Sequence, residues 1–223
     1  MKAPIASSRQ IWLGATKEVS KMTDTLGKPV DSLIRPTVIA LRVLGFRTTG
    51  SCQGHLSHGL KAPWVDIGTP PFALLRAIKA AKKGSAEGEK LNSELKLLVD
   101  ENLHMQERLV GHLDGFYRVR ISPVARRLIL VPEPYGAVRL TNQGAEIQDM
   151  RSSRVARREL LSYREEIVEF AEFLAGEFSR TSLRDLVVPA RDRKALKCTV
   201  IERSVDKASA TFRSAESPGG RRE

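Results

Sequence analysis

Two long helical patterns that enclose a β-hairpin pattern are the feature that most constrains the fold of this chain. Apolar residues recur every three or four positions through residues 90–117 and 152–178, so each segment predicts a helix with one apolar face. Between them, residues 127–131 and 137–140 flank a segment whose two prolines and one glycine favour a turn. Each apolar helix face must pack against another element, so the sequence predicts a sheet with helices packed on it. The apolar positions are Leu91, Leu95, Leu98, Met105, Leu109, Leu113 and Phe116 in the first helix, and Tyr163, Ile167, Ala171, Leu174 and Phe178 in the second.

A shorter helix is predicted over residues 33–44. Pro36 suits a first helical turn and Gly45 suits a C-terminal cap. Asp31 or Ser32 can cap the N-terminus, because short polar side chains there accept hydrogen bonds from free amides.

Further elements are predicted after this helix: strands over 46–51 and 64–68, then a helix over 72–82. The second strand alternates, so Val65 and Ile67 face the core and Asp66 faces away from it. The order of elements predicts an α+β fold, with a small, mostly antiparallel sheet of about four strands and helices, two of them long, packed on it.

The sequence predicts one domain between two terminal segments. Residues 1–30 are expected to be an N-terminal extension, residues 31–178 the single α+β domain, and residues 179–223 a basic, largely disordered tail in which apolar residues become rare. Two widely separated cysteines and a first segment without an apolar signal region predict a cytoplasmic protein with reduced thiols. No apolar run approaches the roughly 20 residues that span a bilayer, so no membrane partner is expected.

The formal charge of +11 is concentrated in the first part of the chain, where residues 1–83 carry thirteen Lys and Arg against four acids. Such a surface attracts polyanions, including nucleic acids and anionic small molecules. No block of five consecutive basic residues is present, so a plainly solvated surface explains the charge equally well. In a nucleic-acid-binding module, the phosphate contacts would come from Arg76, Lys79, Lys83, Arg154, Arg157 and Arg158.

The segment of residues 45–58 concentrates the reactive side chains. Cys52, His55 and His58 lie within seven residues, next to glycines that let the backbone turn sharply. Thiolate and imidazole are good zinc ligands, and the C-x2-H-x2-H spacing can wrap one ion, with Asp66 as a fourth ligand. The spacing is suggestive only, because the segment lacks a paired Cys-x2-Cys knuckle.

Thiol catalysis is a second interpretation of the same segment. Cys52 would be a nucleophile whose pKa is lowered by His55, and Asp66 would orient that imidazole. Candidate ligand-binding groups are Ser51, the amide of Gly54, and Arg139 on the predicted hairpin. In a third interpretation Cys52 is a small buried apolar residue and the histidines are ordinary loop residues.

Several segments resemble an uncharacterised family of bacterial and phage-borne proteins with the signature G-F-x-T-T-x-S-C-x-G-H. The resemblance covers residues 31–178 and implies no activity, cofactor or catalytic role. It rests on Gly45 to His55, on Ala62-Pro63-Trp64-Val65-Asp66, and on Tyr135 to Leu140.

The sequence therefore favours a small enzyme, or an enzyme-like ligand-binding domain, that acts on an anionic substrate with zinc or thiol assistance. The alternative is the nucleic-acid-binding module, with a purely structural Cys-His turn. A third possibility is a scaffold protein that uses its long amphipathic helices to dock a partner.

Overall fold

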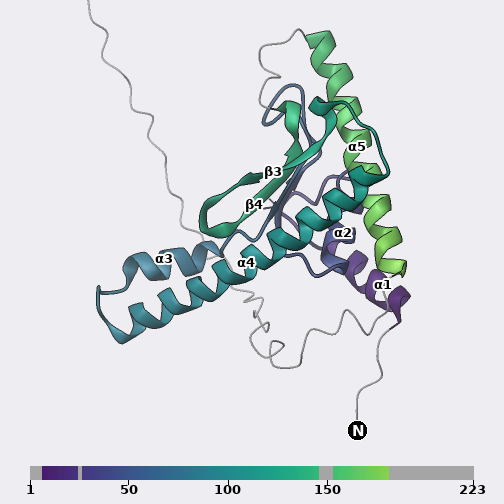
Figure 1. Cartoon of the computed structure of the whole chain (residues 1–223). Helices are drawn as coiled ribbons and strands as arrows, with labels where there is room; N and C mark the ends of the chain where they lie inside the picture. Colours follow the sequence, from purple (N-terminus) through teal and green to yellow (C-terminus); the bar gives the residue numbers. More distant parts are fainter. Residues whose placement is uncertain (1–6, 25–26, 146–152, 181–223) are drawn as a thin grey trace, which may run out of the picture. The chain divides into compact units, whose positions relative to one another are not determined.

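The computed structural model describes residues 7–24, 27–145 and 153–180, all of which belong to one structural unit, residues 1–186. These residues form five α-helices and a four-stranded sheet, which confirms the α+β class (Figure 1). The helices are α1 (Ser8–Val19), α2 (Arg35–Val43), α3 (Phe72–Ala80), α4 (Ala86–Arg118) and α5 (Ser153–Arg180). The strands are β1 (Thr48–Cys52), β2 (Trp64–Ile67), β3 (Leu128–Pro132) and β4 (Val138–Asn142), with short 3-10 turns η1 (Val124–Arg126) and η2 (Pro134–Gly136). Among the described residues, no helix is long and apolar enough to cross a bilayer.

The sheet is antiparallel throughout, in the order β1-β2-β4-β3, so β1 and β3 are its edge strands. Val65 of β2 pairs with Leu140 of β4, and both side chains are fully buried. Because side chains alternate along a strand, Asp66 points to the opposite face, as the sequence predicts. One face of the sheet therefore packs into the core, and the Asp66 side chain lies on the other face.

The core is formed by the inward face of the sheet together with α2, α4 and α5. Six of the nine residues of α2 are buried, because this helix packs against α1, α5 and β1. The predicted apolar face of the last helix is confirmed, with Ile167 and Leu174 fully buried. On α4, Leu109 is fully buried but Leu91 is only half-buried, since the N-terminal part of this helix packs against the short helix α3.

Helix α1 lies in the segment expected to be an extension. It begins with a capping box in which Ser7 and Gln10 exchange side-chain-to-backbone hydrogen bonds of 2.8 and 3.3 Å. The Trp12 ring lies 6.1 Å from the ring of Phe178, and Val19 is buried in the core. The packed part of the chain therefore begins before residue 31. Most of the predicted disordered tail, residues 181–223, lies outside the described residues.

Candidate metal and ligand site

The loop after β1 is fixed by a buried glycine and a distant arginine. Gly54 adopts φ +77°, and a Cβ at this position would lie 2.6 Å from the carbonyl carbon of Ala62. Only glycine fits this backbone without strain. The guanidinium of Arg164 on α5 donates to the carbonyl oxygens of Gln53 (2.9 Å) and Gly54 (2.6 Å). The loop is therefore held in one conformation against α5.

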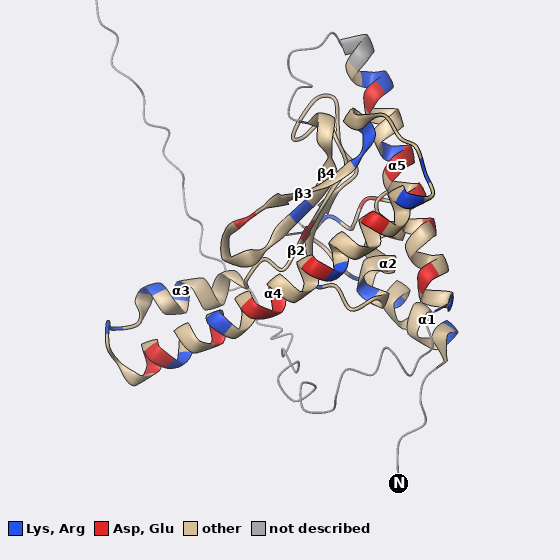
Figure 2. Ribbon diagram, in the orientation of Figure 1, with Lys and Arg blue, Asp and Glu red and all other residues tan. Residues whose placement is uncertain are grey.

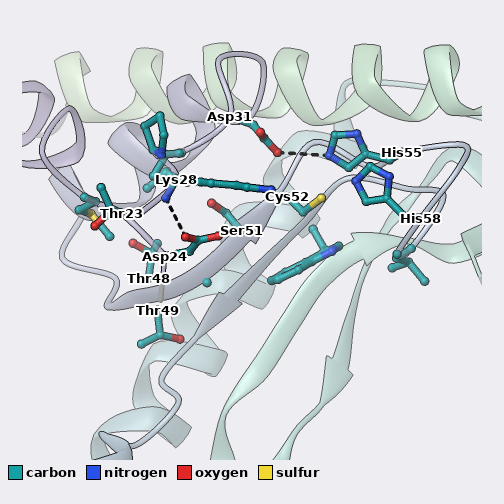
Figure 3. A pocket seen from close by; sticks show the side chains of 18 residues that line it. Thr23, Asp24, Lys28, Asp31, Thr48, Thr49, Ser51, Cys52, His55 and His58 are labelled. Carbon is teal, nitrogen blue, oxygen red and sulfur yellow. Dashed lines mark hydrogen bonds and ion pairs between the residues drawn. The ribbon is translucent and has the colours of Figure 1, made fainter. Parts of the chain in front are cut away.

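Asp31, Cys52 and His55 converge beside this loop. Asp31 Oδ2 accepts a hydrogen bond from the backbone N–H of Gln53 at 3.1 Å and lies 3.7 Å from His55 Nε2. One possible ligand atom from each of the three residues lies within 4.8 Å of the other two (Figure 3). Ligands of a tetrahedral zinc ion are about 3.2–3.8 Å apart, so side-chain adjustments on the order of 1 Å would complete a site. The donor set of one oxygen, one sulfur and one nitrogen suits zinc.

The three side chains lie at the edge of a hollow of about 440 Å³. One wall consists of the whole of β1, and the opposite wall includes Met22, Lys28 and Val30. Figure 3 shows the hydroxyl-bearing side chains Thr48, Thr49 and Ser51 along β1, with Cys52 and His55 near its end. This volume is within the range of about 300–1,000 Å³ that is usual for small-molecule sites.

The Cys52 thiol is not activated by its surroundings. Burial raises the pKa of Cys52 above its ordinary value, and the nearby Asp31 carboxylate raises it further. A hydrogen bond of 3.3 Å from the Gly54 amide to the sulfur and the charge of Arg164 act in the opposite direction but are weaker in sum. The expectation of a lowered thiol pKa is therefore wrong, because burial and a carboxylate outweigh the groups that favour the thiolate.

His58 lies beside His55 rather than in the cluster of three. The two rings stack with their centroids 4.3 Å apart and their planes inclined by 16°. Nδ1 of His58 is 3.0 Å from the hydroxyl of Ser57, and its ring lines the hollow. His58, predicted as a zinc ligand, is thus placed as a neighbour of the cluster, with its ring accessible from the hollow.

Asp66 of β2 and Arg139 of β4 form an ion pair with each other. The guanidinium of Arg139 donates to both carboxylate oxygens of Asp66, at 2.7 and 3.0 Å, and lies 4.5 Å from the centre of the Trp64 ring. This hydrogen bonding raises the pKa of Arg139 above its ordinary value. The register explains the pairing, because Asp66 is opposite Gly50 and Arg139, whereas Cys52 is opposite Trp64.

The structure therefore places Asp31, not Asp66, beside His55, and neither Asp66 nor Arg139 lines the hollow. Asp31 was expected as a helix cap, but α2 begins after Ile34 without a side-chain cap. Its carboxylate is instead free to bind the Gln53 amide. Only the tertiary fold reveals this role, since Asp31 and His55 are separated in the chain by α2 and β1.

Ser51 and Gly54, the other residues predicted to bind a ligand, have different surroundings. Ser51 lines the hollow. The Gly54 amide donates to the Cys52 sulfur and so serves the thiol rather than an external oxyanion. Arg164, which sequence reasoning missed, fixes the loop from α5 and carries no local sequence signal.

The residues predicted for nucleic-acid contact are exposed where the structure describes them. Figure 2, coloured by residue type, shows acidic and basic residues interspersed along α4 and α5. The exposed residues are Arg76, Lys79, Lys83, Arg157 and Arg158, and the side chain of Arg154 lies outside the described residues.

Comparisons of the chain with protein-family models, with curated proteins and with solved structures gave no match. The resemblance to an uncharacterised bacterial and phage-borne family therefore stays a prediction from the signature residues.

Proposed function

We propose that this chain is a small zinc-dependent enzyme, or an enzyme-like ligand-binding domain, whose metal ligands are Asp31, Cys52 and His55. The proposal rests on one observation, the convergence of three possible ligand atoms within 4.8 Å at the edge of a hollow. Three protein ligands leave one position of a tetrahedral zinc ion open, as in catalytic rather than structural zinc sites.

Charge balance supports zinc at this place. The thiol of Cys52 has a raised pKa, so the site without metal holds a neutral thiol beside the Asp31 carboxylate. Zinc binding requires the thiolate, which releases a proton. The charges of Asp31 and the thiolate then equal that of the divalent ion, so the half-buried cluster has no net charge.

The substrate is proposed to carry an anionic or strongly polarised oxygen. A zinc ion with an open position polarises such an oxygen and lowers the pKa of water. Among the charged residues that line the hollow, Lys28 is balanced by the acids Asp24 and Asp31, so the metal would provide the main attraction for an anion. His58, with its ring facing the hollow, is proposed to exchange protons with the substrate.

Cobalt substitution tests both the metal and its open position. Metal-free protein loaded with Co²⁺ should show a sulfur-to-cobalt charge-transfer band and the visible bands of tetrahedral cobalt. Acetohydroxamate, which binds metals through two oxygens, should change the visible bands. Cys52→Ser should remove the charge-transfer band, whereas His104→Ala, at an exposed position on α4, should not. Cobalt bands that match an octahedral aqua ion in the wild-type protein would overturn the proposal.

A further inference from the structure

Strand β1 forms both an edge of the sheet and a wall of the hollow. All five of its residues, Thr48–Cys52, line the hollow, and β2 is its only strand partner among the residues that the structure describes. Every second residue of an edge strand directs its N–H and C=O groups away from the sheet. Within the described part of the chain, no backbone hydrogen bond joins β1 to a segment other than β2.

Among the described residues, the opposite wall makes no backbone hydrogen bond with this edge. This wall comes from Met22–Asp24 and Lys28–Asp31, and the hydrogen bond from the Gln53 amide, just after β1, to Asp31 joins it to the loop. The hollow therefore runs along a strand edge and reaches the three possible metal ligands near the end of that strand, as Figure 3 shows.

We infer that the ligand of this site is a peptide segment in extended conformation that pairs with β1 as an additional strand. An extended peptide carries main-chain donors and acceptors at the repeat that a strand edge requires, which a compact anion does not. Apolar side chains of Met22, Val30 and Leu60 line the hollow and would contact alternate side chains of the peptide. The inference rests on the proposed zinc site, which would bind the carbonyl or terminal oxygen of the peptide at the Cys52 end.

Peptide hydroxamates separate this inference from the zinc proposal. Acetohydroxamate tests binding to the metal alone. Acetyl-dialanine hydroxamate carries the same metal-binding group on a short peptide main chain. Binding is followed by the fluorescence of Trp64, which lines the hollow, in zinc-loaded Trp12→Phe protein. We expect the peptide hydroxamate to bind about tenfold more tightly than acetohydroxamate, because additional main-chain hydrogen bonds form.

Two N-methylated isomers of the peptide hydroxamate are the matched controls. In an extended peptide only alternate N–H groups face a neighbouring strand, so methylation of one nitrogen should weaken binding about tenfold and methylation of the other should change it little. Equal affinities for both isomers and the parent, or a peptide hydroxamate no tighter than acetohydroxamate, would overturn the peptide inference while leaving the zinc proposal intact. Failure of zinc or acetohydroxamate to bind would overturn both.

Discussion

Nε2 of His55 lies 3.7 Å from Oδ2 of Asp31, although α2 and β1 separate these two residues in the sequence. The same oxygen accepts the Gln53 amide, so it is positioned by the backbone of the loop that carries the histidine. A carboxylate fixed in this way is an oriented partner for a ring nitrogen or for a metal ion between them.

Gly54→Ala should destabilise the protein because its backbone and its surroundings both require glycine. The residue has φ +77°, and a methyl group would overlap the carbonyl carbon of Ala62. We expect a loss of about 2–4 kcal/mol in the free energy of unfolding, measured by urea denaturation. Gly59→Ala is the control, since Gly59 has a similar φ of +64° with open space around its Cβ, and should lose only about 1 kcal/mol. Equal losses would show that the contact with Ala62 is unimportant.

Glu166→Gln should be strongly destabilising. Glu166 on α5 is fully buried, and its carboxylate accepts hydrogen bonds from Ser122 (2.9 Å), Tyr117 (3.1 Å) and Arg120 (3.3 Å). A neutral amide would remove the buried counter-charge and leave Arg120 only the partly exposed Glu169, so we expect a loss of about 3 kcal/mol in the free energy of unfolding.

Glu165→Gln is the matched control for this substitution. Glu165 pairs with Arg126 at 3.4 Å, but its side chain is 64% exposed. Exposed ion pairs contribute little, so the loss should be below about 1 kcal/mol by the same denaturation measurement. A loss at Glu165 as large as that at Glu166 would contradict a special role for the buried network.

Alkylation of Cys52 should be slow at neutral pH. Burial and Asp31 raise the pKa of the thiol, so the reactive thiolate is scarce at pH 7 and increases as the pH rises towards the raised value. In a Cys198→Ser background, the rate at which Cys52 reacts with iodoacetamide should rise with pH. This rise should occur at higher pH than for a small free thiol. Added zinc should slow the alkylation of Cys52. A fast reaction at pH 7 whose rate does not change when zinc is added would contradict a zinc site at a thiol of raised pKa.

His112 should make the protein less stable in mild acid. Its pKa is lowered mainly by burial and also by Arg108, against the opposing effect of Glu177. The unfolded chain therefore binds a proton more readily, so the contribution of His112 is complete above about pH 6.5 and is lost as the pH falls through the lower folded value. His112→Gln should flatten the fall in melting temperature between pH 7 and pH 5, and His104→Gln, at an exposed position, should not. If His112→Gln left the fall in melting temperature between pH 7 and pH 5 unchanged, His112 would not be the source of the acid sensitivity.

The order of helices and strands could be predicted because it depends on local patterns. The alternation of Val65 and Ile67 and the helical spacing of Ile167 and Leu174 each report which side faces the core, and all four are buried. Helix α1 is not predicted although Ser7 and Gln10 form a capping box, since its bulky residues Ile11 to Leu13 are consecutive and do not show helical spacing.

The candidate site could be predicted only in part. Cys52 and His55 are neighbours in the sequence, so a short motif identifies them. Asp31 reaches this loop from the segment before α2, and Arg164 reaches it from α5. Such long-range contacts leave no mark in one sequence. Asp66 looked suitable by its position in the chain, but strand register directs it to Arg139.

The most direct test of the account is calorimetric titration of zinc into metal-free wild-type, Asp31→Asn and Asp66→Asn proteins. The account predicts one zinc per chain, binding weakened at least about tenfold by Asp31→Asn, and an unchanged affinity for Asp66→Asn, whose carboxylate belongs to Arg139. No zinc binding by the wild-type protein, or an Asp31→Asn affinity equal to that of the wild type, would contradict it.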